Sequence, residues 1–327
     1  MTRRGRLWTS MLLALLGLAP MIAGAESWPG SEPIKFEVIS AAGGLTDIVP
    51  RELATPMSTA LGVPVVVEDR PGAGGNIAAG VVAKAAPDGH TLLVTGSNQA
   101  VNPTLLPHPG FDYERDLTPV SMVVNAKMLL VAAPSFPART ITDVIAIARA
   151  KPKSISIAIS PIGTPNHLGA EMLAQYANIG LTFVPYNGIA QAIPDLMAGR
   201  VDLAVGAMPS LLPQVRAGAL RALAVTSTER SPLAPNIPTS AESGLSQLRI
   251  DAWICVMGTG GTPAPIVARL DAQIAKALAL PEVRKAFAKQ GVDIFHQNPQ
   301  ELGKFLKSEA VRFRSLLLHS QVQATHK

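Results

Sequence analysis

Small residues gather at points where a strand-like segment runs into a helix-like one, and these junctions are the first candidates for chemistry. The first is Ala41-Ala42-Gly43-Gly44-Leu45-Thr46-Asp47, which follows a β-branched segment ending at Ser40. Glycines allow a ligand close to the backbone, and free N–H groups at a helix start attract anions. Thr46 or Asp47 is suited to cap that helix. One helix end contributes only about 0.3–1 kcal/mol, so an anion site needs several donors, and an ordinary strand-to-helix turn also explains this junction alone.

A second junction has the same composition in the other half of the chain. It reads Ser160-Pro161-Ile162-Gly163-Thr164-Pro165-Asn166-His167, with Thr164 placed as a cap and Pro165 at the first helical position. If two domains face each other, both helix starts point into one cleft, which suits a dicarboxylate or an amino acid. We interpret His167 first as a helix-start residue and only second as a base.

A third glycine cluster, Arg70-Pro71-Gly72-Ala73-Gly74-Gly75-Asn76-Ile77, raises the question of a dinucleotide site. The G-x-G-x-x-G fingerprint requires a small third residue, where this chain has Ile77, and an acidic residue about 20 positions later. Residues 95–97 contain no acid there. We therefore exclude the cofactor interpretation.

Motifs of the common enzyme classes are absent from the sequence. It contains no G-x-S-x-G, H-E-x-x-H or P-loop motif, and its six histidines show no metal-ligand spacing. Of these, His90 in Asp88-Gly89-His90 is interpreted as a turn residue. The titratable candidates near the junctions are His167, Asp47 and Tyr186, and none has an evident catalytic partner. We expect no enzyme activity, no cofactor and no metal.

Composition narrows the class of protein further. The single cysteine, Cys255, excludes an internal disulfide framework. The N-terminus combines Arg3, Arg4 and Arg6 with an apolar run and Ala23-Gly24-Ala25, which is typical of a signal peptide cleaved after Ala25. Either the general or the twin-arginine export route is compatible with it. Without those arginines the net charge of +5 falls to about +2, which with 4% aromatic residues argues against nucleic acid as a partner.

The elements that position the junctions alternate between β-branched runs and Ala-rich helical stretches. Strands are predicted at 34–40, 63–68, 91–95, 128–133, 154–160, 181–186, 203–206, 221–226 and 249–257. Helices are predicted at 47–61, 76–86, 141–150, 166–176, 189–199, 265–280, 281–290 and 299–318. The apolar stretch 117–136 contains Pro119, Asn125 and Pro134, so we expect two strands with a connection rather than a membrane span.

This alternation predicts an α/β protein with two domains, each a mainly parallel sheet flanked by helices. We expect a signal peptide at 1–25, domain 1 at 26–125 plus 251–327, and domain 2 at 126–250. The chain would cross between the domains near residues 125 and 250.

Several ordered motifs resemble one known family. They are 42–47 (AGGLTD), 69–76 (DRPGAGGN), 85–93 (AAPDGHTLL), 184–188 (VPYNG), 220–227 (LRALAVTS) and 261–267 (GTPAPIV). With them the chain, from Ile34 to its C-terminus, is similar to the substrate-binding receptors of tripartite tricarboxylate transporters, also called Bug receptors.

The resemblance implies a periplasmic Venus-flytrap receptor, expected to be monomeric, that closes on a carboxylate ligand and delivers it to membrane permease subunits. A receptor that reports to a membrane sensor would have the same fold and site. The ligand-binding residues it implies are Ser40, Ala41, Ala42, Gly43, Gly44, Thr46, Asp47, Ser97, Asn98, Gly163, Thr164, Asn166, His167, Tyr186, Gly206 and Ala207.

The chain departs from the family pattern at three places in this site. Residues 39–41 replace a Pro-Phe-Pro run, which removes an expected pocket wall. Gly206-Ala207 replaces an acid or amide followed by Asn, so we expect a roomier and more apolar pocket with fewer side-chain hydrogen bonds. Pro50 is acceptable if Asp47 caps the helix and disruptive if the helix begins earlier.

Overall fold

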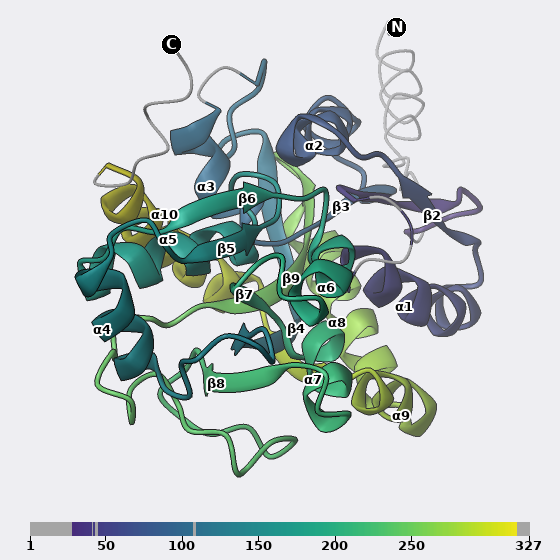
Figure 1. Ribbon diagram of the computed structural model, residues 1–327. Helices are drawn as coiled ribbons and strands as arrows, with labels where there is room; N and C mark the ends of the chain where they lie inside the picture. The colour runs from purple at the N-terminus through teal and green to yellow at the C-terminus, as the bar shows by residue number, and fades with distance from the viewer. Residues whose placement is uncertain (1–27, 41, 43–44, 107–108, 319–327) are drawn as a thin grey trace, which may run out of the picture.

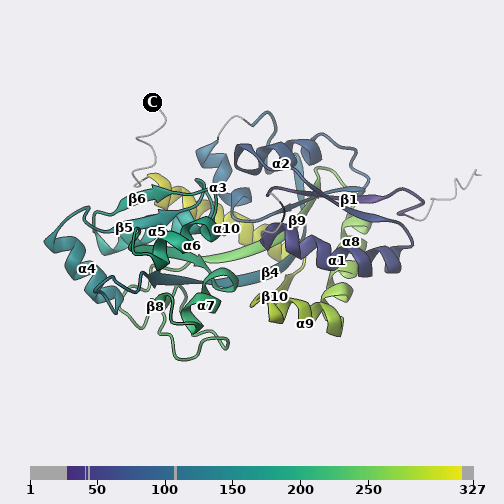
Figure 2. The same cartoon turned by 45° about the vertical axis from the view of Figure 1, so that its right-hand side comes forward.

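Two lobes, each a β-sheet covered by helices, are joined by long strands (Figures 1 and 2). The computed structural model describes residues 28–40, 42, 45–106 and 109–318. The strands hydrogen-bond in the order β2-β1-β3-β9-β4-β7-β5-β6, and β8 and β10 pair additionally with β4. The two-domain α/β fold predicted from the alternating pattern is therefore confirmed.

The first lobe contains a parallel core of three strands. β1 (Ile34–Val38) lies between β2 (Val65–Asp69) and β3 (Thr91–Thr95), and β9 (Asp251–Thr259) pairs antiparallel to β3. The α-helices of this lobe are α1 (Leu45–Leu61), α2 (Asn76–Ala83), α3 (Asn98–Leu105), α8 (Ala264–Ala279) and α9 (Pro281–Lys289). The lobe also contains the short 3-10 helix η1 (Ala73–Gly75) and the strand β10 (Asp293–Gln297). Apolar residues of β1 pack against α1 and α8 and close the core of this lobe.

The second lobe repeats this arrangement. β5 (Ser156–Ile159) pairs in parallel with β6 (Thr182–Pro185) and β7 (Leu203–Ala207). The other elements are β8 (Arg221–Val225), α4 (Ile141–Ala150), α5 (Pro165–Ala177), α6 (Ile189–Met197) and α7 (Met208–Arg216). The C-terminal helix α10 (Pro299–Leu318) packs against α3 and β4. Among the described residues, no helix combines the length and apolarity needed to span a bilayer.

Strand β4 (Leu117–Ala132) connects the lobes, and it corrects the prediction of two strands in 117–136. It is one strand of 16 residues. Up to Lys127 it pairs with β9, and from Met128 it pairs with β7 and β8. Pro119 is tolerated because the register with β9 shifts next to it, where the missing N–H disrupts no regular ladder.

Helix α1 begins earlier than predicted. It starts at Leu45, so Thr46 and Asp47 lie inside the first turn and do not cap the helix. Pro50 is therefore inside the helix, where its ring nitrogen cannot donate to the carbonyl of Thr46. The helix nevertheless continues to Leu61, since its apolar face is buried in the core.

Three elements were not predicted from the sequence: α3, α7 and β10. Helix α3 contains Pro103 and polar side chains on its buried face, and α7 contains Pro209 and Pro213, so neither shows a clean helical pattern. Strand β10 buries few of its side chains, so it lacks the apolar run that identifies a strand. The crossing strands also make the sheets mixed, with antiparallel pairs beside the parallel cores.

Candidate functional site

The carboxyl ends of parallel strands and the starts of the following helices form the candidate site. In the first lobe β1 leads into α1 and β3 into α3; in the second, β5 leads into α5 and β7 into α7. In open α/β sheets, ligands bind at this edge, where helix N-termini expose backbone N–H groups. Both junctions singled out in the sequence therefore lie on edges that favour ligand binding.

At the end of β1, Ser40 presents an unusual hydroxyl. Its Oγ is enclosed by protein and has no hydrogen-bond partner among the described residues. Ala42 is exposed, whereas Ala41, Gly43 and Gly44 lie outside the described residues. A buried hydroxyl without a partner costs free energy, so it is a natural donor for a ligand.

The cluster Gly72–Gly75 supports this turn by packing. Gly75 has a positive φ of 93°, and a Cβ added there would lie 3.0 Å from the Cβ of Ile39. The amides of Asn98 and Asn102 donate to the carbonyl of Gly74 at 2.9 and 2.8 Å. The glycines therefore bring two turns together.

The carboxylate of Asp47 is already engaged in an ion-pair cluster. Arg51 bonds Asp47 through Nε and Asp69 through Nη2, the latter at 2.7 Å. Burial and the neighbouring Asp47 charge raise the pKa of Asp69. Asp47 is only 3% exposed, so its charge is compensated within the first lobe and is not presented to solvent. Thr46 beside it is half-buried.

At the end of β5, Ser160 matches Ser40. Its side chain is 5% exposed, and its Oγ likewise has no partner in the described part of the chain. The following turn is well defined, because the Thr164 hydroxyl donates to the carbonyl of Pro161 at 2.7 Å and accepts from the N–H of His167. The prediction of Thr164 as the cap of α5, with Pro165 at its start, is confirmed.

His167 holds that turn from inside. It is 2% exposed, and its Nδ1 accepts from the N–H of Gly163 at 3.4 Å. Its Nε2 lies 3.7 Å from Oε1 of the equally buried Glu171. Burial lowers the pKa of His167 to about 4 and raises the pKa of Glu171 to about 7. The imidazole is therefore neutral near pH 7 and supports the turn in the way expected of a helix-start residue.

The structure brings Ser97 and Gly163 together across the two lobes. Ser97 Oγ donates to the carbonyl of Gly163 at 3.1 Å, and both residues are buried. The left-handed Gly163, with φ of 85°, faces Val101 and Leu105 of α3. A direct hydrogen bond thus links the β3–α3 turn to the β5–α5 turn.

The polar groups of Asn166 and Tyr186, two further candidates in the second lobe, already have hydrogen-bond partners within the protein. Asn166 donates to the carbonyl of Val205 at 2.9 Å, and the Tyr186 hydroxyl donates to Asp195 at 2.7 Å. Burial, followed by the bond to Asp195, raises the pKa of Tyr186 to about 12. These polar groups therefore stabilise the lobe itself.

The structure shows close packing around Gly206, where we expected more room. A Cβ at this position would lie 2.6 Å from Leu211 Cδ1 and 2.9 Å from Ile189 Cγ1. The space left by the smaller residue is filled by aliphatic side chains, so this wall is more apolar but not wider. Ala207 occupies the N-cap position of α7, and its side chain makes no capping hydrogen bond.

Ser160 is the residue that sequence reasoning missed as a binding candidate, although it begins the second junction. The sequence contained the signal. Ser160 comes directly after Ile159, the last residue of β5, and Ser40 comes two residues after Val38, the last residue of β1. What the sequence could not show is that neither hydroxyl has a hydrogen-bond partner among the described residues.

Comparisons with known proteins identify the family of the chain. The profile of the tripartite tricarboxylate transporter family receptors matches residues 49–321. Protein BugT of Bordetella pertussis is 35% identical over 314 residues, covering 94% of this chain and 96% of BugT.

Two solved structures show the same fold. R. palustris Rpa4515 with adipate has a TM-score of 0.80 and 31% identity, covering 88% of this chain and 97% of that one. MatC from Rhodopseudomonas palustris with bound malate has a TM-score of 0.78 and 30% identity, covering 87% and 98%.

Proposed function

Because this chain belongs to the tripartite tricarboxylate transporter receptor family, we propose that it captures a small carboxylate between its lobes and delivers it to a membrane permease of that transporter type. Structural neighbours of the same fold have been seen with adipate and malate, two dicarboxylates. A dicarboxylate is therefore the first ligand class to consider for this chain.

The observation that carries the proposal is a pair of hydroxyls, Ser40 Oγ and Ser160 Oγ, that find no hydrogen-bond partner in the part of the chain that the structure describes. One follows β1 in the first lobe and the other follows β5 in the second, and a helix starts a few residues after each. Hydrogen bonds to a charged acceptor are worth about 1.5–3 kcal/mol, more than bonds between neutral groups. A carboxylate bridging both lobes would satisfy both hydroxyls.

Compensation of the ligand charge would come from neutral dipoles. None of the described candidate residues is an Arg or Lys, and the Arg51 guanidinium is shared between Asp47 and Asp69. Uncapped helix starts such as that of α7 supply partial positive charge instead. This arrangement suits reversible capture, in which the ligand must also be released.

We propose a receptor and not an enzyme because the titratable candidates are occupied. Asp47 is paired with Arg51, the neutral His167 accepts from the N–H of Gly163, and Tyr186 donates to Asp195. A general base must be able to take a proton from its substrate, and a nucleophile must be activated by one. No described candidate meets either requirement.

The proposed site residues and domain boundaries remain those inferred from the sequence, with Ser160 added. Domain 1 would comprise 26–125 plus 251–327 and domain 2 residues 126–250, after export and cleavage behind Ala25. In support, β4 exchanges its partners between Lys127 and Met128, and Thr226 joins Met128 to Ile250 next to that point. Lobe closure would bend the chain there.

A thermal-shift screen of the mature chain tests the proposal. The screen would contain adipate, malate, other mono- and dicarboxylates, amino acids and neutral analogues. A rise in melting temperature with one carboxylate class, and recovery of that compound unchanged after incubation, supports a receptor. Responses to neutral analogues alone, or conversion of the bound compound, would overturn it.

A further inference from the structure

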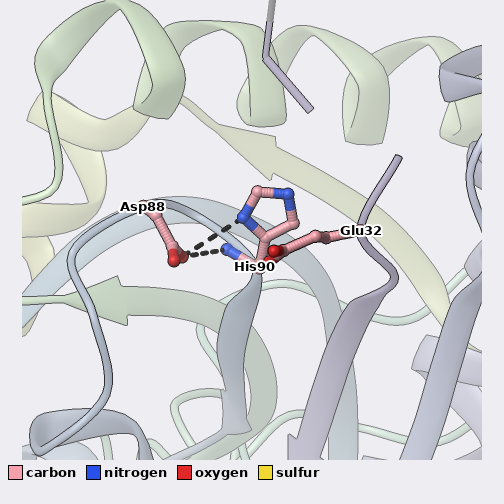
Figure 3. A group of neighbouring side chains, drawn as sticks. All are labelled: Glu32, Asp88 and His90. Atoms are coloured by element: carbon pink, nitrogen blue, oxygen red, sulfur yellow. Dashed lines mark hydrogen bonds and ion pairs between the residues drawn. The ribbon is translucent and has the colours of Figure 1, made fainter. Parts of the chain in front are cut away.

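A second cluster of potential ligands lies at the opposite edge of the first-lobe sheet. Glu32 precedes β1, and Asp88 and His90 precede β3, so all three flank the amino ends of parallel strands. Figure 3 shows their side chains directed toward one another. Ser40 and Ser97, two of the proposed carboxylate-binding residues, follow the carboxyl ends of the same strands. The cluster is therefore separate from the proposed carboxylate site.

A hydrogen bond to a backbone carbonyl places a hydrogen on one ring nitrogen of His90. Its Nε2 lies 2.9 Å from the carbonyl oxygen of Pro29, which can only accept, so Nε2 carries a hydrogen. In the neutral ring, Nδ1 then holds a lone pair. That atom is enclosed by protein and has no hydrogen-bond partner within the described residues.

The lone pair of Nδ1 faces negative charge. Asp88 Oδ1 lies 3.3 Å from it, and Glu32 contributes another carboxylate oxygen nearby. Two acceptors facing each other repel, and a cation between them converts that repulsion into attraction. The donation of Nε2–H to a backbone carbonyl is also the arrangement that orients metal-binding histidines.

The distances agree with one metal ion. One ligand atom from each residue lies within 4.8 Å of the other two. Ligands at about 2.0–2.1 Å from a tetrahedral Zn²⁺ are separated from each other by about 3.3–3.4 Å. The 3.3 Å between His90 Nδ1 and Asp88 Oδ1 matches that separation without rearrangement. Glu32 is exposed, so its side chain is free to complete the set.

The turn that carries two of the ligands is held in place. The N–H of His90 donates to Asp88 Oδ1 at 2.9 Å, and the Trp28 indole donates to the Asp88 carbonyl at 2.7 Å. Gly89 has φ of 82°, and a Cβ there would lie 2.5 Å from Ile266 Cγ2. Ligands held on a rigid turn lose little freedom when a metal binds.

We propose that Glu32, Asp88 and His90 bind a divalent transition-metal ion of the Zn²⁺ class, with a fourth position open to water. One imidazole and two carboxylates suit such an ion, whereas Ca²⁺ requires six to eight oxygen ligands. The ion would tie the segment before β1 to the turn before β3. The sequence concealed this site because Glu32 stands far from Asp88 and His90 in the chain, which is why we expected no metal there.

Calorimetric titration of the mature chain with ZnCl₂ tests this proposal, using a C-terminal tag without histidines and a buffer without chelators. We expect one dominant site per chain. Glu32→Gln and His90→Gln should each weaken Zn²⁺ binding by at least about tenfold, the low end for losing a supporting group of a metal site. Because Glu32 is exposed, Glu32→Gln keeps the test valid even if His90→Gln fails to fold.

His296 provides the matched control. Its Nε2 lies 2.8 Å from Asp271 Oδ1 at the surface, and no third ligand joins this histidine–carboxylate pair among the residues that the structure describes. His296→Gln should leave Zn²⁺ binding unchanged. The proposal is overturned if the wild-type chain shows no saturable Zn²⁺ site, if Glu32→Gln has no effect, or if His296→Gln removes the site instead. Detection of His90 as an imidazolium by NMR at pH 7.5, with no change on adding Zn²⁺, would also overturn it.

Discussion

Replacing Ser40 by Ala is expected to separate ligand affinity from stability. Ser40 Oγ has no partner among the described residues, so its removal breaks no hydrogen bond that the structure shows. The free energy of unfolding should therefore stay the same or rise, because a buried hydroxyl without a partner costs free energy. A lost hydrogen bond to a carboxylate costs about 1.5–3 kcal/mol, which weakens binding by roughly 10- to 150-fold. Ser160→Ala should behave in the same way.

Calorimetric titration with the carboxylate that gives the largest thermal shift measures the affinity of each variant, and urea unfolding without ligand measures its stability. Ser156→Ala on β5 is the matched control. Its hydroxyl donates to Asp202 Oδ2 at 2.6 Å and accepts from the Asp202 N–H at 3.0 Å. This variant should lose about 1–2 kcal/mol of stability and keep its affinity.

Two results would refute this reasoning. If Ser40→Ala and Ser160→Ala both bind the carboxylate as tightly as the wild type, the hydroxyls do not contact the ligand. If either replacement lowers stability as much as Ser156→Ala does, its hydroxyl has a structural partner and the central observation is invalid.

Three further predictions concern the frame around the site. Thr226→Val should lower the free energy of unfolding by about 1–3 kcal/mol, measured in urea, because the buried carbonyl of Ile250 loses its 2.8 Å bond. Burial raises the pKa of Glu171 from 4.5 to about 7, so the wild type loses stability as pH rises through this range and the carboxyl ionises. Glu171→Gln should therefore be more stable than the wild type at pH 8 by about 1–3 kcal/mol. That gain should vanish near pH 4.5, as followed by thermal unfolding; a gain independent of pH would contradict it. Burial also raises the pKa of the Cys255 thiol, so a thiol reagent should modify Cys255 only in unfolded protein.

Periodic and well-capped elements could be predicted from the sequence. The bounds 141–150 for α4 and 91–95 for β3 are confirmed, because Thr140 caps that helix and β3 is a short, almost fully buried run. Strand β4 could not be identified, since prolines and Asn125 interrupt an apolar run that two different partners stabilise. Its continuity depends on tertiary pairing and not on local preference.

The positions of the candidate residues in the strand-to-helix turns could also be predicted, but their availability could not. Asp47, Asn166 and Tyr186 have suitable polar groups for a ligand, yet Arg51, the carbonyl of Val205 and Asp195 respectively occupy those groups. Conversely, Ser160 was overlooked, although its hydroxyl has no partner in the described structure. Hydrogen-bond satisfaction is a property of the folded molecule, and spacing in the sequence does not encode it.

Calorimetric titration of the mature chain with a dicarboxylate and its dimethyl ester shows whether the protein recognises the ligand's charge, because the two compounds differ in charge and little in shape. Adipate and dimethyl adipate are the first pair to use. We predict that one dicarboxylate molecule binds saturably per chain. The affinity for the ester should be at least about tenfold weaker, because the ester forms only neutral hydrogen bonds. Equal binding of acid and ester, or no binding by any acid tested, would contradict the account.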